Sequence, residues 1–439
     1  MPEPKRHIHL AQFLVHGPTY HSHAMWRHPR TKAAGFDWRR PDLYAHIART
    51  CERGKFDMVF FADLNYISDS FRGSLAPALQ YASQAPEHDP IPLMTWLGAV
   101  TDRIGVASTF STSNQHPFYA ARMWSTIDHL TGGRAGWNVV TSINHNQASN
   151  YGMEREATDR RYERADEYFE VCRKLWGSWE TDALVMDPVR PMFADPSKVH
   201  RIDHEGEFFR SRGPLNVVPS PQNGPVILQA GTSPKGRDFA ARHAEAIFAI
   251  QPQRVEARKY RDDIRQRVAE LGRSPDACKV LFGVQVIIGK TEAEAQEKQA
   301  EHNALVEPDA GMTILSAHLD FDLSKLPPDS IMEDHPHPEL QRMRTRYRSD
   351  EGRRLTVREV AQRHGQSVGL PQFVGTPESV TDQLLDFNDY IGGDGFMLSP
   401  IYCPGAIEEF VDLVVPELQR RGRFRTEYVG RTLRDHLTG

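Results

Sequence analysis

The stretch GGRAGWNVVTS, residues 132–142, gives the clearest indication of the fold. A Gly-Gly turn leads through Arg134 into a short, mostly apolar run. Apolar runs of this length are typical of strands that are buried on both faces of a parallel sheet. Asn138 and Thr141 come late in the run. Polar side chains in that position usually face a ligand, because a buried amide or hydroxyl left unpaired costs about 1–3 kcal/mol.

The same pattern recurs along the chain, and apolar runs alternate with amphipathic ones. The predicted strands are His9–Leu14, Asp57–Ala62, Ile104–Phe110, Ala135–Thr141, Val226–Ala230, Ala246–Ile250, Val280–Ile288 and Gly395–Ser399. The predicted helices are Pro41–Arg53, Pro92–Thr101, Pro117–Leu130, Arg160–Trp179, Lys235–His243, Val255–Leu271, Glu292–Leu305, Glu378–Ile391 and Gly405–Arg421. Eight strand–helix units predict an α/β fold, a closed (β/α)8 barrel forming one domain over residues 1–439.

Two stretches exceed what a barrel of this kind needs. Residues 181–224 are rich in Pro, Asp and Gly, and residues 307–375 hold short helical patches and several Pro. We expect both to be insertions at the C-terminal face, the mouth of the barrel, because long loops there shape substrate sites or subunit contacts. The tail, residues 422–439, mixes aromatic and charged residues and is expected to pack on the barrel surface or on a partner subunit.

Composition narrows the class of protein. The chain is 39% hydrophobic and 25% charged, with a net charge of −5, which gives no reason to expect nucleic acid or an anionic membrane as partner. Its start lacks the apolar core of a signal peptide, and no apolar run approaches membrane-spanning length. The four cysteines are far apart and form no CxxC pair, so a cytoplasmic protein with free thiols is expected.

Residues that follow the predicted strands are the candidates for chemistry, since barrel active sites lie at the carboxyl ends of the strands. They are mostly neutral hydrogen-bonding groups, with Asp63 as an exception. This balance suits a planar polar ring system better than a metal or a strongly charged substrate. The residues are Asp63, Leu64, Asn65 and Tyr66; Ser108, Thr109, Ser111, Thr112, Ser113 and Asn114; and Asn138, Thr141, Ser142, His145, Asn146, Asn150 and Tyr151.

The run Val226–Gly236 has two interpretations. Gly231 makes a turn after a strand, Thr232 or Ser233 can cap the next helix, and Pro234 suits its first position. The run therefore describes either an ordinary capped helix or a phosphate site at a helix N-terminus.

A metal site is an alternative interpretation of the histidines near the start of the chain. His7 and His9 form an HxH pair, but they precede or open the first strand, at the end of the barrel away from the chemistry. His21, His23 and His28 are expected to be solvated or lid residues rather than ligands.

Several blocks of the chain resemble the bacterial luciferase-like flavin monooxygenases. The blocks are HIARTCERGKFDMVFFAD, LTGGRAGWNVVTS, RYERADEYFE, KLWGSWE, ADPSKVHRIDHEGEFF, PVILQAGTSPKGRDFAA and FRTEYVGRTLRDHL. The resemblance covers almost the whole chain and is to the branch that contains nitrilotriacetate monooxygenase and dibenzothiophene-sulfone monooxygenase, nearest to the latter. It implies a luciferase-like barrel. The segments DLNYISDSFRGSL and STFSTSNQHPF depart from the sulfone enzyme's pattern where a substrate would lie.

The resemblance also implies roles for individual residues. Thr109 and Asn138 match positions beside the flavin ring and the place where oxygen reacts, and Leu64 matches an apolar residue of the oxygen pocket; these three are the expected catalytic residues. The implied cofactor-binding residues are Asp63, Thr109, Asn138, Ser142, Tyr151, Ala230, Gly231, Thr232 and Ser233.

The implied activity is that of a two-component monooxygenase. It would use O2 and reduced FMN from a separate NADH:FMN reductase to oxidise a hydrophobic aromatic substrate through a flavin peroxide. The substrate could be a sulfone, with cleavage of a C–S, C–N or C–halogen bond. A deazaflavin-dependent dehydrogenase and a non-catalytic flavin-binding relative stay open as alternatives. Relatives are commonly dimers or tetramers, so a homodimer or homotetramer is expected.

Overall fold

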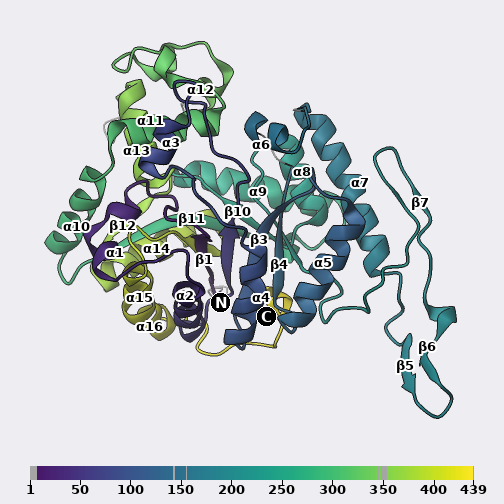
Figure 1. The fold of residues 1–439 in the computed structure, drawn as a ribbon. Helices are drawn as coiled ribbons and strands as arrows, with labels where there is room; N and C mark the ends of the chain where they lie inside the picture. Colours follow the sequence, from purple (N-terminus) through teal and green to yellow (C-terminus); the bar gives the residue numbers. More distant parts are fainter. Residues whose placement is uncertain (1–6, 142–143, 155, 344–345, 348–352, 439) are drawn as a thin grey trace.

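The computed structural model describes residues 7–141, 144–154, 156–343, 346–347 and 353–438. Its centre is a closed barrel of parallel strands surrounded by helices, and both ends of the chain lie at the lower end of the barrel in Figure 1. The fold class predicted from the sequence is confirmed.

All eight predicted strands form, and pairing closes them into a ring. The order is β1–β2–β3–β4–β9–β10–β11–β13 and back to β1. The pair β10–β11 completes the ring, and every pair in it is parallel. The strands are β1 His9–Val15, β2 Met58–Ala62, β3 Gly105–Ser111, β4 Ala135–Val140, β9 Val226–Gln229, β10 Ala246–Ala249, β11 Lys279–Ile288 and β13 Gly395–Leu398. The unpredicted strand β12, Gln372–Gly375, extends the sheet beside the end of β11.

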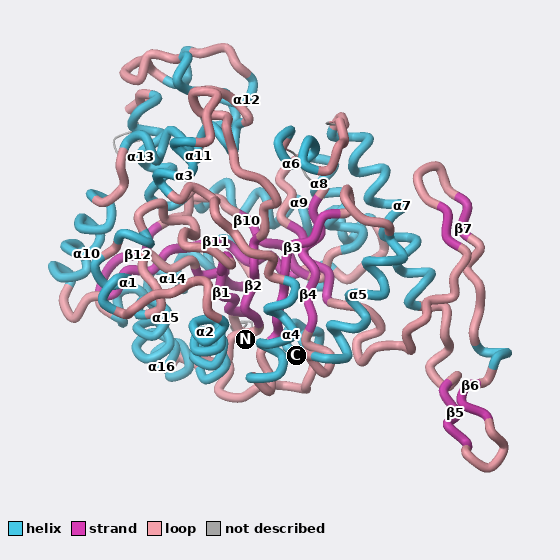
Figure 2. Tube along the Cα trace, in the orientation of Figure 1, coloured by secondary structure: helices cyan, strands magenta, loops and turns pink. Residues whose placement is uncertain are grey.

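The helices lie on the outside of the barrel (Figure 2). Those that alternate with strands are α2 Pro41–Arg53, α4 Ile91–Val100, α5 Pro117–Leu130, α7 Thr158–Trp176, α8 Pro234–His243, α9 Arg254–Glu270, α10 Glu292–Ala304 and α14 Pro377–Ile391. The last predicted helix is split into α15 Gly405–Glu409, a π-helical turn Phe410–Val414 and α16 Val415–Arg420. The remaining helices are α1 Pro29–Ala33, α3 Ala76–Tyr81, α6 His145–Asn150, α11 Pro308–Leu319, α12 Pro338–Met343, α13 Val357–Ser367 and α17 Leu433–Thr438. None of the helices in the described ranges is long and apolar enough to cross a membrane.

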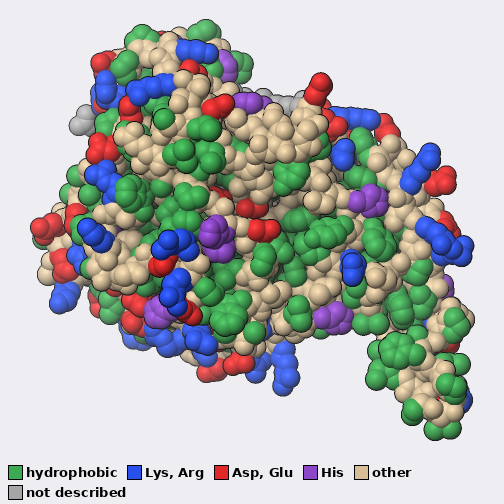
Figure 3. Space-filling view, viewed as in Figure 1, with side chains coloured by type: hydrophobic (Ala, Val, Ile, Leu, Met, Phe, Trp, Pro, Cys, Tyr) green, Lys and Arg blue, Asp and Glu red, His purple; other side chains and the backbone are tan. Residues whose placement is uncertain are grey.

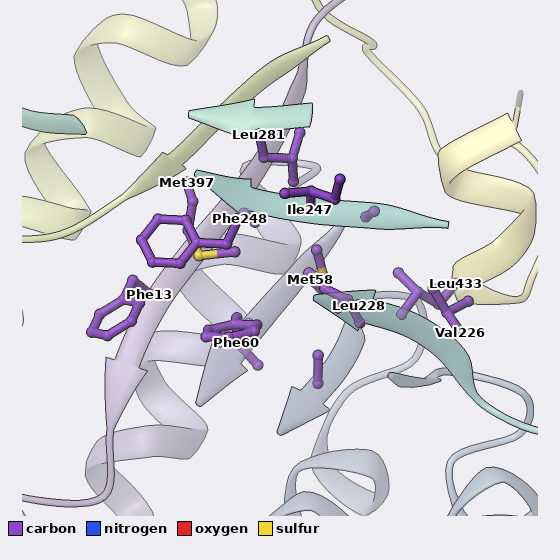
Figure 4. Close-up of a cluster of buried hydrophobic side chains, with 14 of the residues drawn as sticks. Phe13, Met58, Phe60, Val226, Leu228, Ile247, Phe248, Leu281, Met397 and Leu433 are labelled. Atoms are coloured by element: carbon purple, nitrogen blue, oxygen red, sulfur yellow. The ribbon is translucent and has the colours of Figure 1, made fainter. Parts of the chain in front are cut away.

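Large apolar side chains fill the barrel interior (Figure 4). The rings of Phe13, Phe60 and Phe248 lie 5.7–6.0 Å apart, centre to centre. Each side chain of this size contributes about 1.5–3 kcal/mol when it is fully buried. The barrel is therefore a packed core, and space for a ligand lies beyond it, at the carboxyl ends of the strands.

The tail closes the opposite end of the barrel. Arg425 and His9 both contact the fully buried carboxylate of Asp57. Burial alone would raise the pKa of Asp57, but Arg425 and His9 lower it to about 2. His9 thus takes part in a structural contact, and no cluster of metal-ligating side chains exists among the described residues.

The first insertion, residues 181–224, lies elsewhere than predicted. It follows α7 and precedes β9, so it joins the N-terminal ends of the strands rather than the mouth. Its last part lies there: Gln222 donates a hydrogen bond to the carbonyl of Ala135, the first residue of β4. The hairpin of β5 (Leu184–Asp187) and β6 (Met192–Ala194) projects from the side of the molecule, beyond the short pair β7 (His204–Glu205) and β8 (Arg210–Ser211) (Figure 1).

The second insertion, residues 307–375, lies at the mouth as predicted. Its helices α11 and α13 pack closely, and a Cβ atom on Gly311 would come within 2.2 Å of the Ala361 carbonyl oxygen. The insertion has a hydrophobic core of its own, which also takes in Phe71 from the loop after β2. It is therefore a rigid wall fixed to the barrel loops.

Candidate active site

One cavity of about 330 Å³ lies where β2, β3, β4 and β9 end, under the second insertion. Its volume falls within the range of small-molecule sites. The described residues that line it are Asp63, Leu64, Asn65, Tyr66, Thr109, Ser111, Val140, Thr141, Asn144, Gln147, Tyr162, Gln229, Ala230, Gly231, Ala317, His318 and Asp320.

The described residues that line this cavity are neutral or acidic. Among the described lining residues there is no Lys or Arg, whereas Asp63 and Asp320 are acidic. Burial raises the pKa of Asp63 to about 7, with Asp89 adding to the shift and the hydrogen bonds from Asn65 and Leu64 opposing it. Burial and the neighbouring Asp63 also raise the pKa of Glu87. The wall is therefore neutral to acidic and disfavours a polyanionic ligand.

Thr109 and Asn138 form a pair across neighbouring strands. They are direct partners in the β3–β4 register, and Asn138 Nδ2 donates a hydrogen bond of 2.9 Å to Thr109 Oγ1. Thr109 Oγ1 is thus an acceptor here, which leaves its hydroxyl hydrogen to be donated into the cavity. Asn138 Oδ1 is buried and has no partner among the described residues.

The loop after β9 is held from several sides. Tyr260 donates a hydrogen bond of 2.9 Å to the carbonyl of Gly231, and Ser233 Oγ caps α8 by accepting from the amide of Gly236 at 3.1 Å. A Cβ atom on Gly236 would lie 2.7 Å from the Tyr162 hydroxyl. Glycine is therefore required for Tyr162 to reach the cavity wall beside this loop.

Histidines gather around the mouth of the barrel. His21, His23 and His28 are at most 9% exposed, so the expectation that they are solvated is wrong. His21 stacks on Phe13 with ring centres 3.8 Å apart. Burial lowers the pKa of His21 and of His23 to about 3, so both are neutral at physiological pH.

The predicted site residues are largely brought together. Asp63, Leu64, Thr109, Ala230 and Gly231 line the cavity. Asn138 lies behind Thr109, and Thr232 and Ser233 lie at the start of α8. Tyr151 is on the rim, where its hydroxyl bonds Asn65 at 3.2 Å; Ser142 lies outside the described residues.

Other lining residues were missed. Tyr162, Gln229, Asn144, Gln147, Ala317, His318 and Asp320 line the cavity without having been predicted. Gln229 carried a usable signal, because it is a polar residue late in the apolar run Val226–Ala230. His318 and Asp320 carried none, because they come from an insertion whose position depends on tertiary packing.

A closed (β/α)8 barrel with a cavity at the carboxyl ends of its strands is the architecture of a barrel enzyme. The family model of luciferase-like monooxygenases matches residues 20–394, and the chain belongs to this family.

Relatives support the assignment over the full length. The chain is 42% identical over 444 residues to dibenzothiophene-sulfone monooxygenase of Rhodococcus erythropolis (strain XP), covering 99% of this chain and 97% of that protein. It is 40% identical over 425 residues to nitrilotriacetate monooxygenase component A of Aminobacter aminovorans, covering 94% and 92%. The crystal structure of the riboflavin lyase RcaE with modified FMN and riboflavin superposes with a TM-score of 0.90 at 32% identity, covering 99% and 96%.

Proposed function

We propose that the chain is a two-component monooxygenase that uses O2 and reduced FMN, supplied by a separate NADH:FMN reductase, to oxidise an uncharged, largely apolar substrate such as an aryl sulfone. The observation that carries the substrate class is the lining of the cavity, which holds no Lys or Arg among its described residues. A polycarboxylate such as nitrilotriacetate would meet Asp63 and Asp320 there without a compensating cation.

The residues present fit FMN. The cavity has the volume of a small-molecule site, Asn138 Oδ1 is a buried polar atom without a partner among the described residues, and Gly231 of the turn before α8 lines the cavity. In this proposal Thr232, Ser233 and the N-terminus of α8 hold the phosphate. Asp63, Thr109, Ala230 and Gly231 border the ring system, with Tyr151 at the rim.

Reduced FMN, when bound, supplies the two electrons with which one atom of O2 goes to the substrate and the other to water. The chain's own groups do the rest. Asn138 fixes the Thr109 hydroxyl so that its hydrogen points at the reacting region, as a preorganised donor. Leu64 supplies an apolar wall that excludes water.

Reconstitution tests the proposal. Purified protein with FMN, NADH and a flavin reductase should consume dibenzothiophene sulfone, and photoreduced FMN without the reductase should support the same turnover. Nitrilotriacetate is the matched anionic substrate and should give only uncoupled peroxide. Turnover of nitrilotriacetate at an equal or higher rate, or peroxide release with every uncharged substrate, would overturn the proposal.

A pair of variants tests the role of Thr109. Thr109→Val keeps the shape of the side chain but removes the hydroxyl, and kcat/KM should fall by about 10²-fold. Thr126→Val makes the same change on the exposed surface of α5 and should leave kcat/KM unchanged. Equal kcat/KM in the two variants would remove Thr109 from the site.

A further inference from the structure

A chain of three side chains leads from the cavity into the core of the second insertion. His318, at the end of α11, is exposed to the cavity that it lines. Its Nδ1 lies 2.8 Å from Nε2 of His364 on α13, and Nδ1 of His364 lies 2.5 Å from the hydroxyl oxygen of Tyr347. His364 is fully buried and Tyr347 is 7% exposed. Figure 1 shows α11 and α13 side by side above the barrel.

All three groups are neutral at physiological pH. Burial lowers the pKa of His318 to about 4 and that of His364 well below its usual value, and it raises the pKa of Tyr347 above its usual value. Each imidazole therefore carries one N–H, and Tyr347 carries its O–H. The three side chains together carry three such hydrogens, and the position of each can be assigned.

The hydroxyl of Tyr347 sets the direction. Within the described part of the chain its one hydrogen-bond partner is His364 Nδ1. A buried O–H without an acceptor costs about 1–3 kcal/mol, so Tyr347 donates and His364 Nδ1 accepts. The hydrogen of His364 is consequently on Nε2, where it donates to Nδ1 of His318. This leaves the hydrogen of His318 on its own Nε2.

Nε2 is the ring nitrogen of His318 that His364 does not use, and no hydrogen bond joins it to another described residue. His318 is exposed and lines the cavity. If the two hydrogen bonds ran in the opposite direction, the O–H of Tyr347 would be unpaired. Nε2 of His318 would then carry no hydrogen and would be an acceptor instead of a donor. The two directions therefore predict opposite chemistry at the cavity wall.

We propose that Tyr347 and His364 are positioning residues that hold His318 as the Nε2–H tautomer, so that it donates a hydrogen bond to an uncharged oxygen acceptor on the substrate, such as a sulfonyl oxygen. This deepens the proposed function and rests on it for the identity of the ligand. The tautomer itself does not depend on that function.

Two ligands that differ only in their acceptors provide the binding test. Dibenzothiophene sulfone has two sulfonyl oxygens, and dibenzothiophene has none. Tyr347→Phe removes one hydroxyl and should raise the Kd of the sulfone by about 3- to 10-fold, the value of one neutral hydrogen bond. The Kd of dibenzothiophene should not change. Calorimetry on the protein with oxidised FMN measures both.

The His318→Gln variant tests whether Tyr347 acts on the ligand through His318. His318→Gln places an amide N–H near the position of Nε2 and does not use His364 or Tyr347. In this background Tyr347→Phe should leave the Kd of the sulfone unchanged. An equal loss in both backgrounds, or an equal loss for both ligands, would mean that Tyr347 is merely structural and would overturn the proposal.

Solid-state 15N NMR of histidine-labelled protein reads the tautomer directly, with the His318 signals assigned by their loss in His318→Gln. The wild type should show a protonated Nε2 and a bare Nδ1, and Tyr347→Phe should show both tautomers. A wild-type His318 protonated on Nδ1 overturns the proposal even if Tyr347→Phe does not fold. The expected tautomer without binding of either ligand would instead reject the proposed substrate class.

Discussion

The two insertions look alike in sequence but differ in structure. Both are rich in Pro and lack long helical patterns, yet residues 307–375 form a wall of the cavity and residues 181–224 contain a projecting hairpin. The wall has a buried core, and the hairpin exposes Met186, Val189 and Phe193 by 62%, 87% and 67%. Figure 3 shows apolar side chains gathered on the projecting arm at the lower right.

The difference follows from the end of the barrel at which each insertion begins. Residues 307–375 follow α10 and return through β12 beside the carboxyl end of β11, where they meet the loop after β2. Arg72 of that loop pairs with Asp309 at 2.9 Å, and its amide bonds Asp322. Residues 181–224 instead follow α7 and lead to the N-terminal end of β9. A long connection thus acquires a core where other loops converge and stays extended where they do not.

The largest effect on stability is expected when the same substitution, Leu to Ala, is made in each of the two insertions. Leu315 is fully buried in the core of the wall, and Leu184 on the hairpin is 40% exposed. Leu315→Ala should lower the free energy of unfolding by about 2–5 kcal/mol. It should also reduce turnover, because α11 carries Ala317 and His318, which line the cavity. Leu184→Ala should change the free energy of unfolding by less than about 0.5 kcal/mol. Urea denaturation of both variants measures this, and equal costs would contradict the comparison.

A smaller effect is expected where two helices of the wall touch. Gly311→Ala places a methyl group against the backbone of Ala361, which cannot rotate away, and should cost about 1–3 kcal/mol. Gly177→Ala is the control, since its Cβ meets nothing closer than 3.4 Å and its φ is −83°. Thermal unfolding compares them; a Gly311→Ala protein as stable as Gly177→Ala would show that α11 and α13 can shift apart.

The barrel and half of the site could be predicted because both follow local rules. The strands read as apolar runs, and Thr109 and Asn138 stand out as polar residues inside them. Strand order then brings the ends of β2, β3, β4 and β9 to one place. No long-range information is needed for these steps.

The remainder depends on packing between distant segments. His318 reaches the cavity because α11 packs on α13 and α3, and nothing near residue 318 encodes that. The burial of His21 and His23 likewise comes from the wall above them: the amide of His23 donates to the carbonyl of Gly365 on α13. The composition of residues 181–224 does not indicate an end of the barrel, and their position follows instead from α7, the helix that precedes them.

The pH dependence of stability should distinguish a carboxylate of the cavity from one of the hairpin. Asp63 has a raised pKa of about 7 in the folded protein. Its contribution to the free energy of unfolding is therefore complete at pH values below its pKa in the unfolded chain, and it is lost as pH rises toward 7. Asp63→Asn should therefore gain in Tm relative to wild type between about pH 5 and about pH 8. Asp187 on the hairpin has a lowered pKa, because Arg190 and the amide of Val189 bond it, and is ionised across this range. The plot of Tm against pH for Asp187→Asn should run parallel to that of the wild type. A parallel plot for Asp63→Asn would contradict the raised pKa of Asp63.

The smallest effect on stability, but a clear one on assembly, is expected at the tip of the hairpin. An arm with no core of its own buries Val189 and Phe193 only against another molecule, and we expect a second copy of this chain. Replacing both by Ser should leave the free energy of unfolding within about 0.5 kcal/mol of wild type, yet reduce the mass measured by light scattering after gel filtration. Val255→Ser, at a 48% exposed apolar residue on α9, is the control and should keep the wild-type mass. If the hairpin variant also keeps that mass, self-association does not use the arm, and the difference between the two insertions is one of packing alone.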